Sequence, residues 1–352
     1  MMQKTYLVTG GAGFIGSNYI RALLDSDRDI QVINLDKLTY AGNLENLRGV
    51  EQDPRYTFVH GDICDGALLQ KLFAENPVDY LVHFAAESHV DRSIEGADEF
   101  VRSNVNGTVA LLNAAMAAWR EGEGYKDGVK FLQVSTDEVY GSLGPEGLFC
   151  EETPLDPHSP YSASKAAGDL MAKAFYDTHR LPVNITRCSN NYGPYQFPEK
   201  LIPLMINNCR QHKPLPVYGD GKQVRDWLHV ADHCAAIELV LTKARAGEVY
   251  NIGGQNEREN LQIVQAILDY MVQRDSEVGD HLIQHVTDRK GHDRRYAIDA
   301  IKIHRDLGWQ PRIFFEEGIR QTLDWYMENG DWVDHVTSGS YQDYYQQMYG
   351  NR

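Results

Sequence analysis

The stretch TGGAGFIGSNYI, residues 9–20, constrains the fold more than any other part of the chain. Gly10, Gly13 and Gly16 stand between a short apolar segment and a helical pattern. Glycines let the backbone turn tightly and approach a bound pyrophosphate, which then lies at the positive end of the helix. Asp36 ends the next apolar segment, where a carboxylate can accept hydrogen bonds from ribose hydroxyls. This arrangement predicts a dinucleotide-binding site.

Apolar, strand-like segments alternate with helical segments through the first half of the chain. The strand-like segments begin at Thr5, Gln31, Tyr56, Val78, Val129 and Leu181. Apolar residues recur at three- and four-residue spacing in 104–119 and 161–177, which predicts two helices. The alternation predicts an α/β fold with a doubly wound parallel sheet of the Rossmann type. The segment 228–254 resembles a further helix and strand that rejoin this sheet.

After about residue 190 the long alternation of strand-like and helical segments stops, and prolines interrupt short segments. We therefore expect a smaller C-terminal substrate-binding domain. The predicted division assigns 1–189 with 228–254 to the dinucleotide-binding domain and 190–227 with 255–352 to the second domain. The tail SYQDYYQQMYG, residues 340–350, is aromatic enough to be expected to pack on the body.

Composition narrows the classes of function. The net charge of -16 disfavours nonspecific nucleic-acid binding, which needs basic residues that neutralise phosphates. No stretch reaches the roughly 18 apolar residues of a membrane span, and the N-terminus enters a strand at once. We expect a cytoplasmic protein without nucleic-acid or membrane partners. The five cysteines are widely spaced and form no CxxC, so neither a disulfide framework nor a metal site is expected.

Two carboxylates bear on the identity of the dinucleotide. Asp36 would repel the additional phosphate of NADP, so NAD is favoured, whereas the neighbouring Lys37 could tolerate that phosphate. Asp62 ends the third strand-like segment and is a candidate contact on the adenine side. A loop-capping aspartate is the alternative interpretation of Asp62, and the sequence leaves both open.

Tyr161 and Lys165 form a YxxxK pattern at the start of a predicted helix. Four-residue spacing places both side chains on one face of the helix. A lysine ammonium stabilises a nearby phenolate, so we expect the pKa of Tyr161 to be lowered, helped by a positively charged nicotinamide. The tyrosine can then act as a base towards a substrate hydroxyl.

Two adjacent acids, Asp137 and Glu138, follow Thr136 at the end of the fifth strand-like segment. Ligands gather at the carboxyl ends of parallel strands, so the pair is a candidate acid and base. A solvated junction between strand and loop is the alternative. In a regular strand neighbouring side chains face opposite sides, and both acids have to face one pocket. We therefore predict that the strand ends at Thr136 or Asp137.

The glycines, Ser135-Thr136 and the YxxxK pattern together resemble the extended short-chain dehydrogenase/reductase family, whose members mostly act on sugar nucleotides. Within that family STDEVYG resembles the signature of the dTDP-glucose 4,6-dehydratases. The resemblance covers almost the whole chain. Further similar segments are LDKLTYAGNLENL, HFAAESHVDRSI, SPYSASKAAGD, RCSNNYGPYQFPEKLIPL, YGDGKQVRDWLHV and DRKGHDRRYAID.

The resemblance implies two sets of binding residues. The implied NAD contacts are Gly10, Gly13, Phe14, Ile15, Gly16, Asp36, Lys37, Thr39, Asp62, Ile63, Phe84, Ala85, Ala86, Ser88, Ser103, Tyr161, Lys165 and Asn191. The implied nucleotide-sugar contacts are Ser88, Thr136, Asn190, Lys200, Leu201, Pro216, Tyr218, Arg225, Asn260, Asp288 and His292. One position departs from the pattern, because Lys290 stands where the family usually has proline. That departure leaves the preference for thymine or uracil open.

The resemblance also implies a reaction, with Thr136, Asp137, Glu138, Tyr161 and Lys165 as its catalytic residues. Tyr161 would take the proton of the sugar 4-hydroxyl during oxidation at C4. Glu138 would then take the C5 proton while Asp137 protonates the departing 6-hydroxyl, and hydride would return to C6. The helices 104–119 and 161–177 would pair across a homodimer as a four-helix bundle.

Two other functions remain to be weighed. A nucleotide-sugar epimerase or decarboxylase shares the fold, but the pair Asp137 and Glu138 argues against it. A noncatalytic NAD-sensing scaffold would have no need for Tyr161, Lys165 and the acid pair together.

Overall fold

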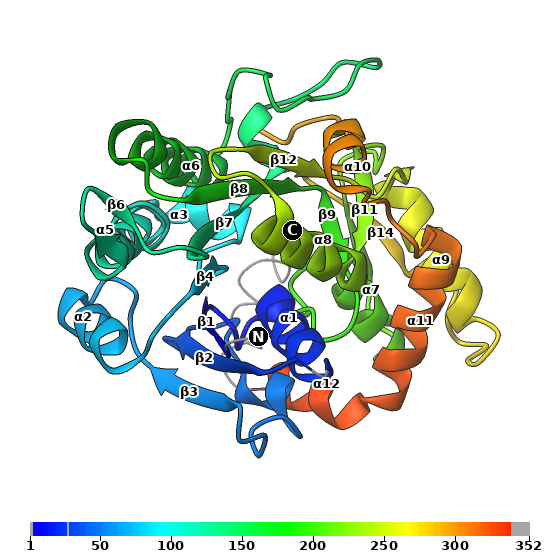
Figure 1. The fold of residues 1–352 in the computed structure, drawn as a ribbon. Helices are drawn as coiled ribbons and strands as arrows, with labels where there is room; N and C mark the ends of the chain where they lie inside the picture. Colours follow the sequence, from blue (N-terminus) through cyan, green and yellow to red (C-terminus); the bar gives the residue numbers. More distant parts are fainter. Residues whose placement is uncertain (1–2, 27, 339–352) are drawn as a thin grey trace.

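The computed structural model describes residues 3–26 and 28–338 (Figure 1). Its centre is a parallel sheet of seven strands in the order β12-β8-β7-β4-β1-β2-β3, which confirms the predicted doubly wound α/β fold. The strands are β1 Lys4–Thr9, β2 Ile30–Asp36, β3 Tyr56–His60, β4 Tyr80–His83, β7 Lys130–Thr136, β8 Val183–Cys188 and β12 Val249–Ile252. The predicted return to the sheet is also confirmed, because β12 pairs in parallel with β8.

Helices cover both faces of this sheet (Figure 1). Buried residues of α1 and α8 form one core with the sheet, and buried residues of α2, α5 and α6 form another. These helices are α1 Phe14–Leu24, α8 Val230–Lys243, α2 Gly66–Glu75, α5 Thr108–Trp119 and α6 Pro160–His179. Because both faces are covered, the strands other than the edge strand β3 are buried along nearly their whole length.

Helix α6 is fixed at its start by the sequence SPYSASK. Ser159 and Ser162 form a capping box, and Pro160 occupies the first turn, where its missing N–H costs no hydrogen bond. The cap places Tyr161 in the first turn and Lys165 one turn later, both buried.

The segment before α5 differs from the prediction. A helix was expected from residue 104, but Val101–Gly107 is a π-helix and α5 begins at Thr108. Within the π-helix Asn104 is buried, and its side-chain amide donates to Ser164 Oγ at 2.8 Å and accepts from the Glu87 N–H at 2.8 Å. Wider helical turns of this kind often occur near functional sites.

The alanine-rich spacing of α6 marks its outer face. Ala163 and Ala174 are exposed, and Leu170 keeps 59% of its surface exposed, whereas Ala172 and Phe175 are buried against the sheet. Helices α5 and α6 lie side by side at one side of the molecule (Figure 1).

Residues beyond 190 build smaller sheets and a core of their own, centred on Met205, Ile206, Ile263 and Leu323. Strands β9 Asn190–Tyr192, β11 Val224–His229 and β13 Glu257–Glu259 form one sheet, and β10 Leu215–Tyr218 pairs with β14 Ile283–Val286. The helices of this core are α7 Leu201–Arg210, α9 Asn260–Met271, α11 Phe315–Glu328 and α12 Gly330–Val336. Helix α10 Ile301–Leu307 instead places Ile303 in the core that α1 and α8 form with the large sheet. The predicted domain division stays a prediction.

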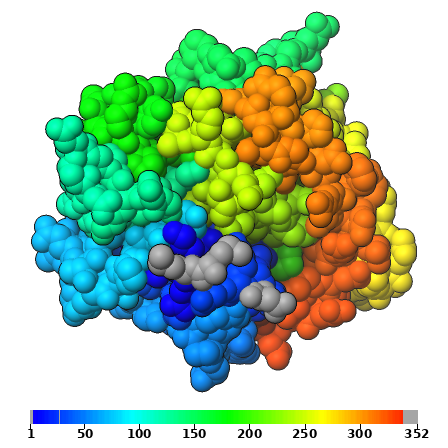
Figure 2. Space-filling view, in the orientation of Figure 1, coloured from blue at the N-terminus to red at the C-terminus, as the bar shows by residue number. Residues whose placement is uncertain are grey.

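The remaining short elements lie in the segments between these helices and strands. They are α3 Val90–Glu95, α4 Asp98–Phe100, β5 Arg120–Glu121, β6 Gly124–Tyr125 and the 3-10 turns Leu44–Leu47, Asp137–Tyr140 and Asp280–Leu282. At the end of the described chain, Trp332 in α12 donates its indole N–H to Asn46 Oδ1 at 2.9 Å. Figure 2 shows the C-terminal elements in red against the N-terminal region in blue. The tail 340–350 lies outside the described residues.

None of the helices formed within residues 3–26 and 28–338 has the length and apolar character needed to cross a membrane. In the same ranges, no three side chains of His, Cys, Asp or Glu form a group that could hold a metal ion.

Truncation of a central core residue tests this fold. Leu7 in β1 is fully buried between two strands, so Leu7→Ala is expected to lower the free energy of unfolding by about 3 kcal/mol through lost burial and a residual cavity. Leu148→Ala, at a loop position that is 51% exposed, serves as the control and should change it by no more than about 0.5 kcal/mol. Urea titrations of both variants measure the difference. Equal effects would contradict the placement of β1 in the core.

Candidate active site

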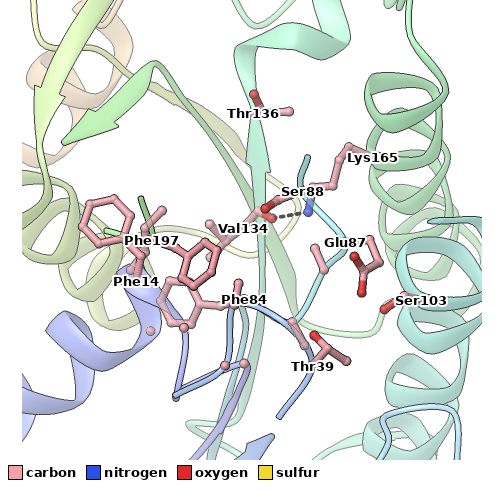
Figure 3. A pocket seen from close by; sticks show the side chains of 18 of the residues that line it. Phe14, Thr39, Phe84, Glu87, Ser88, Ser103, Val134, Thr136, Lys165 and Phe197 are labelled. Carbon is pink, nitrogen blue, oxygen red and sulfur yellow. Dashed lines mark hydrogen bonds between the residues drawn. The ribbon is translucent and has the colours of Figure 1, made fainter. Parts of the chain in front are cut away.

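A cavity of about 310 Å³ lies over the carboxyl ends of β1, β2, β4 and β7. Every predicted NAD contact lines it, from the glycine loop to Asn191. Figure 3 shows Phe14, Phe84 and Phe197 gathered on one side and Lys165 on the other. The structure therefore brings these residues to one cavity, and their roles as ligands remain predictions.

The glycine loop is shaped for close approach by a ligand. Gly10 has a φ of +72°, and a Cβ there would lie 2.6 Å from the backbone nitrogen of Ala85. A Cβ on Gly16 would lie 2.3 Å from the Gly10 carbonyl oxygen. Helix α1 has no side-chain cap and no acidic residue in its first turn, so its N–H groups are left for an anion. These features fit the pyrophosphate of a dinucleotide.

Asp36 lies at the end of β2, and each of its carboxylate oxygens accepts a backbone hydrogen bond. Its Oδ2 accepts from the Ala12 N–H at 2.9 Å and its Oδ1 from the Leu38 N–H at 2.8 Å. Each oxygen keeps a further lone pair for a ribose hydroxyl. Burial raises the pKa of Asp36, and the two backbone hydrogen bonds oppose that change.

Lys37 is held by two acids, Asp62 at 3.1 Å and Glu99 at 3.3 Å. The charge that could tolerate the additional phosphate of NADP is thus partly neutralised, which strengthens the preference for NAD.

Asp62 has the loop-capping role that the sequence left open. It accepts from the Cys64 N–H at 2.9 Å and from Arg102 at 2.6 Å. Burial opposes ionisation, but the hydrogen bonds from Cys64, Arg102 and Lys37 together lower the pKa of Asp62 to about 2. Contact with adenine stays a prediction.

Tyr161 and Lys165 lie together on the buried face of α6. Lys165 Nζ donates to the Val134 carbonyl oxygen at 2.7 Å (Figure 3). Burial raises the pKa of Tyr161 well above its usual value, and the charges of Glu138 and Asp137 add to this, while a hydrogen bond with Thr136 opposes it. The expected lowering of this pKa is therefore wrong for the protein alone. The physical reason is that desolvation and two nearby acids outweigh the neighbouring lysine.

The two acids of the signature follow the strand directly. Strand β7 ends at Thr136 and Asp137–Tyr140 forms a 3-10 turn, which confirms the predicted strand end. The Thr136 hydroxyl accepts from the Glu138 N–H at 3.3 Å and caps the turn. Because a 3-10 turn removes the strict alternation of a strand, both acids line the same cavity.

Asp137 and Glu138 have different surroundings, which favour a protonated Asp137 and an ionisable Glu138. Asp137 is 1% exposed, and burial raises its pKa well above the usual value, with further contributions from Glu138 and Asp226. Burial also raises the pKa of Glu138, but Lys200, Arg225 and Arg289 oppose the change. Asp137 is thus suited to give a proton, and Glu138 to take one. Asp137 Oδ2 has no hydrogen-bond partner among the described residues, so it can meet a substrate.

A second cavity of about 170 Å³ adjoins the first, since Glu138, Asn190 and Lys200 line both. The predicted sugar-nucleotide contacts on its wall are Asn190, Lys200, Leu201, Pro216, Tyr218, Arg225, Asn260 and His292. Ser88 and Thr136 line the first cavity instead.

Asp288 lines neither cavity. It pairs with His292 Nδ1 at 2.6 Å and accepts from Gln223 Nε2 at 3.0 Å, so it positions the wall rather than forming it. Lys290, which replaces the usual proline, is exposed and also lines neither cavity. Direct contact of either residue with a ligand is not supported by these positions.

The second cavity gathers basic groups in an acidic protein. Arg225 and Arg289 line it with Lys200, and the Arg225 guanidinium lies 4.2 Å from the centre of the Tyr296 ring. Charge-assisted donors of this kind suit a diphosphate.

The contacts expected from the sequence did not name three residues of this wall, Arg289, Glu199 and Tyr296. Arg289 lies within the basic run DRKGH, but its ion pair with Asp91, at 2.7 Å, joins positions far apart in the chain that spacing does not reveal.

Comparison with known proteins gives consistent matches over nearly the whole chain. A family model described as GDP-mannose 4,6 dehydratase matches residues 7–322. The dTDP-glucose 4,6-dehydratase of Xanthomonas campestris pv. campestris (strain B100) is 55% identical over 343 residues, which cover 96% of this chain and 97% of that protein.

Two solved structures carry the same name. The dTDP-glucose 4,6-dehydratase of Streptomyces venezuelae, with NAD bound, has a TM-score of 0.88 and 50% identity, covering 94% of this chain and 99% of that chain. The enzyme of Bacillus anthracis, in complex with NAD, has a TM-score of 0.85 and 50% identity, covering 95% and 99%. This chain therefore belongs to the dTDP-glucose 4,6-dehydratase family.

Proposed function

We propose that this chain converts dTDP-glucose to the 4-keto-6-deoxy sugar and water, with NAD as its bound cofactor. The observation that carries the proposal is the turn at Asp137–Tyr140, which lines the same cavity as Tyr161 and Lys165. The turn presents Asp137 as a buried acid and Glu138 as a base whose negative charge is favoured by nearby basic groups. An oxidation alone would not require that pair. The identity of 50–55% to enzymes with this name supports the substrate.

The cofactor would be held by the glycine loop, by Asp36 and by the first turn of α1. When bound, NAD would supply the hydride acceptor for oxidation at C4 and the hydride donor for reduction at C6. All proton movements fall to side chains of this chain.

Tyr161, hydrogen-bonded with Thr136, takes the proton of the 4-hydroxyl. The pKa of Tyr161 is raised in the protein alone, and the positive charge of a bound nicotinamide would favour the phenolate. The resulting ketone at C4 acidifies the hydrogen at C5. Glu138 takes that proton, Asp137 gives its proton to the 6-hydroxyl, and the C6–O bond breaks to release water. Glu138 returns its proton to C5 to complete the product, and solvent takes the proton from Tyr161 and restores the one on Asp137.

The diphosphate would lie in the second cavity, near Lys200, Arg225 and Arg289. The names of the relatives favour thymine as the base. A panel of dTDP- and UDP-activated sugars, analysed by mass spectrometry for loss of one water, tests that preference.

Glu138→Gln tests the assignment of the base. The amide cannot accept the C5 proton, so we expect formation of the keto sugar to fall by roughly a hundredfold to ten-thousandfold. Some hydride transfer should remain, visible as absorbance of the reduced dinucleotide. Glu146→Gln, at an exposed loop position, is the control and should behave as the unaltered protein. Full dehydration by the Glu138 variant would contradict the assignment of Glu138 as the base, whereas a wild type that releases no water from the sugar would favour an epimerase or decarboxylase of the same fold.

Asp137→Asn tests the protonation state of the acid through stability. The folded protein raises the pKa of Asp137, so the unfolded chain ionises at lower pH than the folded one and wild-type stability falls as pH rises between these values. Asparagine does not titrate. We therefore expect the variant to gain stability over the wild type as pH increases from about 5 to 8, while losing activity. Urea titrations across that range measure the gain, and a difference independent of pH would contradict the raised pKa.

We further propose a homodimer in which α5 and α6 of two copies form a four-helix bundle, and we retain the expectation that the protein acts in the cytoplasm. The outward residues Ala163, Leu170 and Ala174 support the dimer, because small residues permit close helix approach and Leu170 is a large exposed apolar side chain.

Leu170→Glu is expected to convert the dimer to a monomer, because it places a charge in the centre of the proposed interface. Light scattering after gel filtration should then give a mass near 39.9 kDa instead of twice that value. The matched control is Leu148→Glu, on an exposed loop away from these helices, which should leave the mass unchanged. A wild type that runs as a monomer would refute the dimer.

A further inference from the structure

Behind the two cavities, a buried arginine joins the elements that carry the catalytic groups. Arg187 in β8 is 6% exposed, and β8 pairs with β7 so that Arg187 lies opposite Ser135, next to the start of the acid turn. Its Nε donates to Asp169 Oδ2 at 2.9 Å, and its Nη1 donates to the Tyr140 hydroxyl at 2.9 Å. Asp169 belongs to α6, and Tyr140 ends the 3-10 turn that begins at Asp137. One guanidinium thus contacts both catalytic elements.

The Tyr140 side of this network is fixed from several directions. Its hydroxyl donates to Asn251 Oδ1 in β12 at 2.8 Å while accepting from Arg187. Its ring stacks on Phe149, with 5.1 Å between ring centres. Asn251 is held in turn by the Phe149 carbonyl oxygen and by Glu151. With Thr136 capping the first end, both ends of the turn that presents the acids are anchored.

The Asp169 side reaches the catalytic lysine. Asp169 follows Lys165 by four residues and Tyr161 by eight, so the three lie along one face of α6. Besides Tyr161, the titratable groups of the described residues whose charges interact with Lys165 are Asp169 on its own helix, Cys188 on β8 and His83 on β4. Burial lowers the pKa of Lys165, and the charge of Asp169 is the largest effect opposing that change. Burial raises the pKa of Asp169, and the charge of Arg187 is the largest effect opposing that rise.

We propose that Arg187, with Asp169 and Tyr140, is a positioning unit that fixes the Tyr161–Lys165 pair relative to the Asp137–Glu138 pair. This inference rests on the proposed function, in which those pairs act on neighbouring carbons of one sugar. None of the three residues lines either cavity, so the unit acts through other groups and touches neither substrate nor cofactor.

The chemistry makes such a unit necessary. Tyr161 works at the 4-hydroxyl, while Glu138 and Asp137 work at C5 and C6, so a small shift of the turn against the helix misplaces a proton transfer. A displacement of about 1 Å is enough to cost about a hundredfold in rate. Arginine suits the role because its planar fork holds two partners in fixed directions, which a lysine ammonium on a flexible stem does not.

Tyr140→Phe is the decisive variant, because it removes one hydroxyl and keeps the stacked ring. We expect its kcat for keto-sugar formation to fall by about ten- to a hundredfold, with KM for dTDP-glucose and the affinity for NAD within twofold of wild type. Arg187→Lys should show the same split. Tyr250→Phe is the matched control: it removes the hydroxyl of another buried tyrosine, adjacent to Asn251 in β12, and should leave kcat unchanged.

Asp169→Asn gives a second readout that loss of packing alone would not produce. Without the Asp169 charge the pKa of Lys165 falls further, so the alkaline limb of the kcat/KM profile should move to lower pH. Tyr140→Phe keeps both charges and should leave that limb in place.

The results separate this inference from the function on which it rests. A wild type that forms no keto sugar refutes the proposed function, and the inference with it. An active wild type with a Tyr140→Phe kcat equal to that of Tyr250→Phe, or with an unshifted profile for Asp169→Asn, refutes the positioning unit alone. Should Arg187→Lys fail to fold, the tyrosine pair still decides the question.

Discussion

The parallel alignment of the strands is the constraint on which the rest of the structure depends. Because every strand of the seven-stranded sheet runs in the same direction, their carboxyl ends meet at one edge. The glycine loop after β1, Asp36 at the end of β2 and the acid turn after β7 are distant in sequence but line one cavity. The position of the site is thus determined by the fold. The return strand β12 adds the edge strand next to β8.

The buried ionisable groups of the site are expected to lower the stability of the fold. Asp137, Tyr161 and Lys165 are buried, and burial alone shifts the pKa of each towards the neutral form. A cluster of this kind is expected to cost stability and to persist because it is needed for chemistry. The neighbouring ion pair between Arg187 and Asp169 is also buried, which is weak support for stability but a firm geometric link between elements. Both features are explained better by reaction geometry than by folding.

Local patterns in the sequence were enough to predict much of the fold. The strand-like segments, the glycine loop and the YxxxK pattern each depend on residues close together in the chain, and the structure contains them where expected. The strand end at Thr136 followed from a chemical requirement rather than from propensity. The start of α5 could not be predicted from local patterns. The π-helix at Val101–Gly107 that precedes it depends on contacts of Asn104 with Glu87 and Ser164, which are distant in the sequence.

The features that could not be predicted from the sequence depend on packing between residues far apart in the chain. The raised pKa of Tyr161 reflects burial and the carboxylates of another element, neither of which appears in the YxxxK spacing. The unit formed by Arg187, Asp169 and Tyr140 brings together three separate segments.

The most direct measurement uses dTDP-glucose carrying deuterium at C4, incubated with the purified protein and NAD in ordinary water. The proposed reaction predicts a 4-keto-6-deoxy product that has lost one water and carries the deuterium at C6. A product that retains its oxygen at C6, or a keto sugar without deuterium at that carbon, would contradict this reaction.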